Sequence, residues 1–125
     1  MAIIKILLAD DDEKFAMMIE GALVQAGFSV VRALDGEAAL ASVKIEKPDL
    51  VLLDIMMPKK IGFEVLEEMK ADRGLRSIPV ITLSHLAQPS DILKSKRLGA
   101  LEHLIKTEFS IRELLDKVSR YAARK

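Results

Sequence analysis

The sequence predicts one α/β domain, a doubly wound parallel sheet of five strands with five helices. Three observations predict it. The chain has 125 residues, the usual length of one domain. Five short apolar runs alternate with five segments whose apolar residues recur at helical spacing, which is typical of a parallel sheet covered by helices. The runs are apolar at nearly every position, as in strands buried on both faces. With right-handed crossovers, we expect the strand order 2-1-3-4-5.

The composition excludes several classes of protein. Lys and Arg together number 19, and so do Asp and Glu, so no basic field favours nucleic acid or an anionic membrane. Cysteine is absent, which excludes disulfides, thiolate catalysis and cysteine metal sites. The early apolar run Ile3–Ala9 is too short to span a membrane. We therefore expect a cytoplasmic protein that binds neither nucleic acid nor membrane through this domain.

The five strand–helix units follow one another without a repeat or a linker. The predicted strands cover 3–9, 28–31, 50–54, 80–84 and 101–105. The predicted helices cover 13–26, 37–47, 63–72, 89–99 and 111–122.

Capping signals support several of these boundaries. Asp12 is expected to cap the first helix, and Asp35-Gly36 is expected to form a turn before the second. Ser110 and Glu113 have the spacing of a capping box at the start of the last helix. The fourth helix has few apolar residues, so we expect it to be the most loosely packed.

Polar residues stand where four of the five predicted strands end. The first strand is followed by Asp10 and Asp11, and the third ends at Asp54. The fourth ends at Ser84, and the fifth is followed by Lys106. In the expected strand order these residues lie side by side at the carboxyl edge of the sheet, where open α/β sheets bind ligands.

Together these residues have the chemistry of phosphoryl transfer. Three converging carboxylates repel one another, and a divalent cation relieves the repulsion. An all-oxygen site suits Mg²⁺, which also accepts phosphate oxygens. Lys106 adds positive charge and Ser84 adds a hydroxyl, both suited to stabilising a transferring phosphoryl group. Asp54 lies between them and is the candidate nucleophile, which would form an acyl phosphate.

Four motifs in order carry a resemblance to a known family: LLADDD, PDLVLLDIMMP followed by Gly62, PVITLS, and GALEHLIK. With their spacing, they resemble the receiver domain of two-component response regulators, the CheY-like family, over nearly the whole chain. The resemblance implies a flavodoxin/CheY-like fold. We expect a single receiver domain over 1–125, with no output domain in this chain.

The resemblance also implies a role for each site residue. Asp54 would accept a phosphoryl group from a sensor histidine kinase, a phosphotransfer protein or a small phosphodonor. Asp11 and Asp54 would be direct Mg²⁺ ligands, Asp10 would act mainly through water, and Met56 would supply its backbone carbonyl.

Phosphorylation in this family switches a protein-binding surface. Ser84 would turn toward the phosphoryl group with Lys106, and His103 stands at the aromatic switch position. The output surface would be the fourth helix, fifth strand and fifth helix, which would bind a downstream protein. The chain would not be an enzyme beyond slow self-dephosphorylation. We expect a monomer, with a phosphorylation-linked dimer as the alternative.

Lys60-Ile61 replaces an acidic residue that is usual in the family before the glycine, and two further departures bear on the site. Thr107 stands where the family usually has a cis proline, and a cis bond to another residue costs about 2.5–4 kcal/mol. We therefore predict a trans Lys106–Thr107 bond. His85 follows the switch hydroxyl, where a small residue is usual. An imidazole at the pocket mouth would hinder the water that attacks the acyl phosphate, so we predict slower self-dephosphorylation than in an otherwise identical His85→Ala protein.

Other functions fit the sequence less well. A phosphatase with an aspartyl nucleophile needs a second acid shortly after Asp54, but Ile55 and Met56 follow. Flavin binding lacks a hydroxyl-rich phosphate loop, and nucleotide binding lacks a glycine-rich loop. A receiver-like docking module that is never phosphorylated is the remaining alternative, and the complete set of pocket residues argues against it.

Overall fold

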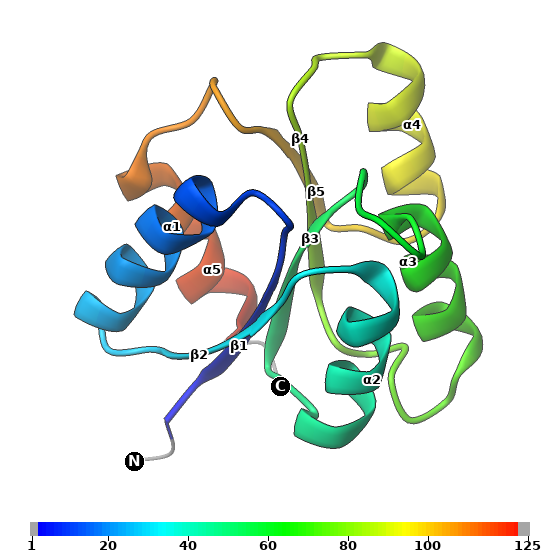
Figure 1. Cartoon of the computed structure of the whole chain (residues 1–125), viewed down its shortest axis with the longest axis horizontal. Coiled ribbons are helices and arrows are strands. Elements are labelled where there is room, and N and C mark those ends of the chain that lie inside the picture. Colours follow the sequence, from blue (N-terminus) through cyan, green and yellow to red (C-terminus); the bar gives the residue numbers. More distant parts are fainter. Residues whose placement is uncertain (1–2, 123–125) are drawn as a thin grey trace.

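The computed structural model describes residues 3–122 and contains one five-stranded parallel sheet (Figure 1). Its strand order is β2-β1-β3-β4-β5, which confirms the predicted doubly wound α/β fold. The strands are β1 (Lys5–Ala9), β2 (Ser29–Ala33), β3 (Leu50–Asp54), β4 (Val80–Ser84) and β5 (Glu102–Ile105). Every residue of β3 and β4 is buried, as the continuous apolar runs predicted.

Five helices cover the two faces of the sheet. They are α1 (Glu13–Gln25), α2 (Gly36–Glu46), α3 (Gly62–Ala71), α4 (Pro89–Arg97) and α5 (Ile111–Ala122). Helices α1 and α5 lie on one face, and α2, α3 and α4 on the other (Figure 1). Alternate residues of the central strands divide accordingly: Leu8 and Leu52 join one apolar cluster, and Leu7 and Leu53 join the other. None of the described helices is long and apolar enough to cross a membrane.

The capping predictions are largely confirmed. The Asp12 side chain accepts from the N–H of Phe15 at 3.2 Å. Ser110 and Glu113 form a capping box, each side chain accepting from the other's N–H. The expected Asp35-Gly36 turn is wrong in detail, because Gly36 is already helical and Asp35 caps α2 through the Ala38 N–H at 2.8 Å.

Close packing against β3 explains why the PKKIG segment has a glycine at position 62. The first residue of α3 packs against the end of β3 so closely that a Cβ there would overlap the Asp54 carbonyl. The N–H of Gly62 donates to the Ile55 carbonyl at 3.0 Å. This contact fixes the backbone immediately after Asp54, so it positions the site.

At the opposite end of the sheet, the starts of β1 and β3 are held together. The N–H of Lys5 donates to an Asp49 carboxylate oxygen at 2.7 Å, and the N–H of Asp49 donates to the Lys5 carbonyl at 2.8 Å. Lys5 Nζ also lies 2.9 Å from a Glu46 carboxylate oxygen. These contacts tie two central strands and the end of α2 together.

Helix α4 is packed loosely, as predicted. Its only buried residue is Ser95, while Leu93 is 67% exposed. Lys94 Nζ lies 4.8 Å from the centre of the Phe63 ring, a cation–π contact with α3. Little apolar surface therefore holds this helix to the sheet.

Candidate functional site

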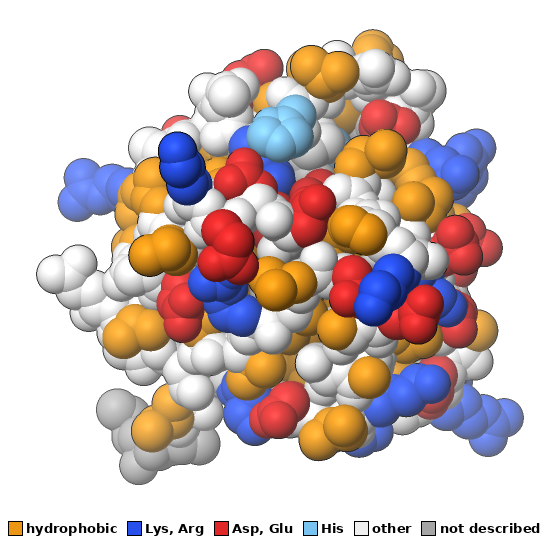
Figure 2. All heavy atoms as spheres, viewed as in Figure 1, with side chains coloured by type: hydrophobic (Ala, Val, Ile, Leu, Met, Phe, Trp, Pro, Cys, Tyr) orange, Lys and Arg blue, Asp and Glu red, His pale blue; other side chains and the backbone are white. Residues whose placement is uncertain are grey.

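The structure brings the predicted polar strand ends to one edge of the sheet. Asp54 is paired in register with Leu83, and Ser84 with Ile105, so the ends of β3, β4 and β5 lie side by side. Asp10 follows β1, which is the other neighbour of β3. Figure 2 shows carboxylates gathered near the middle of this face of the molecule, with exposed hydrophobic side chains around them.

Three carboxylates form a compact acidic group at this edge. One oxygen from each of Asp10, Asp11 and Asp54 lies within 4.8 Å of the others. Asp10 and Asp54 are buried, whereas Asp11 is exposed. Asp10 Oδ1 accepts from the Asp12 N–H at 2.9 Å, which orients its carboxylate. The group has the all-oxygen chemistry and open side that a hard divalent cation requires.

Lys106 is the counter-charge of this group. Its Nζ lies 2.7 Å from Asp10 Oδ2 and 3.2 Å from Asp54 Oδ2, and its side chain is almost fully buried. Burial by itself would lower the pKa of Lys106, but the hydrogen bonds and charges of Asp10 and Asp54 outweigh it and raise the pKa. Nζ also lies 4.7 Å from the centre of the Phe15 ring. The ammonium group is therefore firmly charged and held in place.

Asp54 is a buried carboxylate with a raised pKa. Burial raises its pKa from 3.8 to about 6, and the negative charge of Asp10 adds to the effect. The Met56 N–H, which donates to Oδ1 at 3.1 Å, and Lys106 both oppose the rise. Burial is therefore the main reason that the ionised form of Asp54 is disfavoured.

Ser84 and His103 are in contact with each other. Ser84 Oγ lies 2.9 Å from Nε2 of His103 and donates to the Leu86 carbonyl at 2.9 Å. The His103 ring is half-buried, and burial lowers its pKa below the ordinary 6.5. The ring thus points toward the Ser84 hydroxyl in this structure. Its movement between rotamers stays a prediction.

A cavity of about 410 Å³ opens beside Asp54. The side chains that line it include Met56, Ser84, His85 and Leu86. Met56 is 69% exposed, and its N–H rather than its side chain contacts Asp54. His85 lies at the cavity wall, as its position after Ser84 predicted, so it borders the space next to the carboxylate.

The Lys106–Thr107 bond is trans, as predicted, because no peptide bond among residues 3–122 is cis. Thr107 is exposed. Sequence reasoning missed three contacts of the site: Phe15 beneath Lys106, and Thr82 and Ser95 against the His103 ring. Burial of Ser95 in a helix of such low apolar content had no periodic signal in the sequence.

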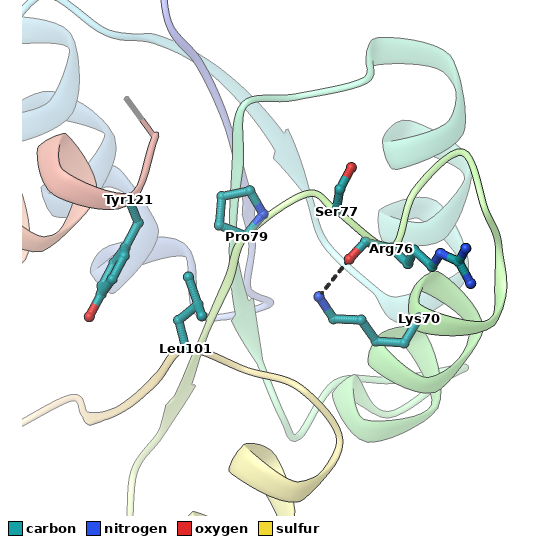
Figure 3. Close-up of a pocket in the computed structure, with 6 residues that line it drawn as sticks. All are labelled: Lys70, Arg76, Ser77, Pro79, Leu101 and Tyr121. Atoms are coloured by element: carbon teal, nitrogen blue, oxygen red, sulfur yellow. Dashed lines mark hydrogen bonds between the residues drawn. The ribbon is translucent and has the colours of Figure 1, made fainter. Parts of the chain in front are cut away.

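A second cavity, of about 280 Å³, has no residue of the acidic group in its lining, and Figure 3 shows the residues that line it. It is lined by Lys70, Arg76, Ser77, Pro79, Leu101 and Tyr121. Lys70 Nζ donates to the Arg76 carbonyl at 3.0 Å, so this lysine holds the loop that leads into β4. The lining contains no carboxylate or paired catalytic groups, and we assign the site to the Asp54 edge instead.

Comparison with known proteins agrees with the fold. The family model for the response regulator receiver domain matches residues 6–119. The chain belongs to the response regulator receiver domain family. This family consists of phosphate-accepting signalling domains rather than catalytic enzymes.

Individual relatives are longer proteins or receiver domains of similar length. The chain is 40% identical over 118 residues to a gliding motility regulatory protein of Myxococcus xanthus, covering 94% of this chain and 15% of that protein. It spans 44% of a probable transcriptional regulator of Cyanophora paradoxa, with 39% identity over 88% of this chain.

Two solved structures of response regulators are similar over nearly the whole chain. The phosphorylated cyanobacterial phytochrome response regulator RcpA has a TM-score of 0.85 at 31% identity, covering 99% of this chain and 97% of that one. The Mn²⁺-bound form of response regulator Rcp1 has a TM-score of 0.84 at 27% identity, covering 97% and 96%.

Proposed function

We propose that this domain is a phosphorylation switch in which Asp54 accepts a phosphoryl group in the presence of Mg²⁺. The donor would be a sensor histidine kinase, a phosphotransfer protein or a small acyl phosphate. The observation that carries the proposal is that the buried Lys106 ammonium contacts Asp10 and Asp54, the two buried members of the acidic group. The family membership, the phosphorylated relative and the Mn²⁺-bound relative support it.

The chemistry of the transfer is a displacement at phosphorus. A carboxylate oxygen of Asp54 forms the new P–O bond while the P–N bond of a phosphohistidine donor breaks and the imidazole leaves. The carboxylate needs no base, because it is the ionised form that attacks. Lys106 Nζ, already 3.2 Å from Asp54, neutralises charge on the transferring oxygens.

Asp10, Asp11 and Asp54 would hold the cation, with the Met56 carbonyl as a further ligand. Bound there, Mg²⁺ supplies positive charge to carboxylate and phosphoryl oxygens. Burial raises the pKa of Asp54, and a cation bound beside it would favour the ionised, attacking form. Asp11, the exposed member of the group, leaves a route for the ion from solvent.

The output of the switch would be a protein-binding surface on α4, β5 and α5. Ser84 and Lys106 stand at the ends of β4 and β5, so a phosphoryl group on Asp54 would attract both strand ends. Helix α4 follows β4 and is held by little apolar surface, which suits it to respond. The partner would be a downstream protein, and the unphosphorylated domain would be a monomer.

Intact mass spectrometry after incubation with Mg²⁺ and acetyl phosphate tests the proposal. We expect one phosphoryl adduct in the wild type and none in Asp54→Ala or in excess chelator. No adduct in a folded wild-type protein that binds metal would favour a docking module instead. Continuous turnover of phosphoesters would favour a phosphatase.

A further inference from the structure

The aromatic ring of Phe15 lies against the ammonium group of Lys106. Phe15 is in the first turn of α1, and Lys106 Nζ lies 4.7 Å from the centre of its ring. The same Nζ contacts Asp10 and Asp54, and the lysine side chain is 2% exposed. Two carboxylates and one aromatic ring therefore enclose the charge. The electron-rich face of such a ring attracts a cation, and the attraction is strongest where water is excluded.

Hydrogen bonds at the start of α1 set the position of this ring. Asp10 Oδ1 accepts from the Asp12 N–H at 2.9 Å, and Asp12 Oδ1 accepts from the Phe15 N–H at 3.2 Å. Asp10 Oδ2 lies 2.7 Å from Lys106 Nζ. The contacts thus form a closed loop that starts and ends at the lysine and passes through two aspartates and the phenylalanine. The segment that places a carboxylate beside the lysine also places the ring beside it.

A second ring, that of Phe109, packs against Phe15. The two ring centres are 6.4 Å apart and the ring planes meet at 85°, the edge-to-face arrangement that aromatic pairs favour. Phe109 lies between β5 and α5, in the loop that follows Lys106. Both rings pack against the same apolar cluster of buried side chains. The Phe15 ring is therefore fixed by apolar neighbours as well as by the helix cap.

Lys106 depends on such contacts for its position. Its stem is flexible, and the trans bond to Thr107 leaves the backbone after it without the restriction of a proline ring. Asp10 and Asp54 hold the ammonium in the metal-free protein, but both belong to the proposed cation site. A divalent ion bound there would share their charge and weaken their hold on the lysine. The ring is no metal ligand, so its contact with the ammonium would persist.

We propose that Phe15 is a positioning residue whose ring holds the Lys106 ammonium at the pocket by a cation–π contact. Its effect on phosphoryl transfer rests on the proposed function, in which Lys106 acts on the transferring oxygens. The contact itself belongs to the unphosphorylated protein. A cation–π contact depends on electron density at the face of the ring, whereas a packing role depends on the size and shape of the ring.

Fluorination of Phe15 tests the contact. Mono-, di- and trifluorinated phenylalanine, introduced at this position alone, withdraw electron density from the ring face and nearly keep the size of the ring. In urea unfolding of the metal-free protein, we expect the unfolding equilibrium constant to rise with each fluorine, by about 3- to 30-fold over the series. The ¹H–¹⁵N signal of the Lys106 ammonium should exchange faster with water in the same order. No trend in either measurement overturns the proposal.

Two control series show whether the lysine is responsible. In Lys106→Met the ring has no cation, so fluorination of Phe15 should produce no trend. The same series at Phe28, which is partly buried and has no cation over its ring among residues 3–122, should also produce none. An equal trend in either control means that fluorine acts through packing, which contradicts the proposal. The Phe28 series decides this point even if Lys106→Met does not fold.

A phosphorylation arm tests the consequence for transfer. With saturating Mg²⁺ and acetyl phosphate, intact mass spectrometry gives the initial rate of adduct formation. We expect this rate to fall by about 3- to 30-fold from phenylalanine to its trifluorinated form at position 15. Phe15→Tyr keeps an aromatic face and should stay close to wild type, whereas Phe15→Leu should lose at least as much as the trifluorinated ring.

The possible outcomes separate the contact from the proposed function. Equal transfer rates across the Phe15 series, with stability still following fluorination, contradict the positioning role. Absence of the adduct in wild type contradicts only the proposed function, because urea unfolding and ammonium exchange still decide whether the ring holds Lys106.

Discussion

Replacing Asp54 with Asn should stabilise the metal-free protein at neutral pH. A pKa raised from 3.8 to about 6 means that ionising this carboxyl in the folded state costs roughly 3 kcal/mol more than in the unfolded chain. An amide carries no charge and avoids that cost. It has one acceptor oxygen, so it gives up either the Met56 or the Lys106 hydrogen bond, worth about 1 kcal/mol. We expect Asp54→Asn to raise the free energy of unfolding by about 1–2 kcal/mol at pH 7.

The stability difference between wild type and Asp54→Asn should depend on pH. Because the folded pKa of Asp54 is raised, the wild type binds more protons than its unfolded chain between pH 3.8 and about 6, and its stability falls as the pH rises through that window. The advantage of Asp54→Asn should therefore be complete above about pH 6 and vanish near pH 4. His103 is present in both proteins, so its titration cancels.

Urea unfolding in chelator, followed by circular dichroism from pH 4 to 7.5, measures the difference. Added Mg²⁺ should narrow the gap, because it binds the wild-type carboxylates better than the amide. A less stable Asp54→Asn at pH 7, or a difference that does not change with pH, would refute the reasoning.

Three further predictions concern the lifetime of phosphorylated Asp54, the packing at Gly62 and the helix cap at Ser110. His85→Ala should shorten the lifetime of phosphorylated Asp54, measured by intact mass after donor removal; equal or longer lifetimes contradict a shielding role. Gly62→Ala should destabilise the fold by about 1–3 kcal/mol in urea unfolding, because its Cβ meets the Asp54 carbonyl. Gly21→Ala in α1, with nothing within 4 Å of the new Cβ, is the control and should stabilise by about 0.5–1 kcal/mol. Ser110→Ala should cost about 0.5–2 kcal/mol by the same assay, and no change would mean that the observed capping box contributes nothing.

The sequence predicted the sheet well because burial on both faces makes each strand a continuous apolar run, and alternation with helices leaves few topologies. It also predicted the polar residues at the carboxyl ends of the strands, because each of them ends or closely follows a continuous apolar run. It misplaced the start of α2 because Asp35-Gly36 suits both a turn and a helix cap. It missed Thr82 and Ser95 beside His103, because contacts between elements distant in sequence leave no periodic pattern.

The paired bonds between Lys5 and Asp49, with the Glu46 ion pair beside them, have a consequence for how the domain moves. They join β1 and β3 at the starts of these strands, at the opposite end of the sheet from Asp54. Local opening of backbone amides should therefore be rarest at the starts of β1 and β3 and most frequent toward α4. A conformational change that begins at Asp54 would therefore spread toward α4 and leave the starts of β1 and β3 in place.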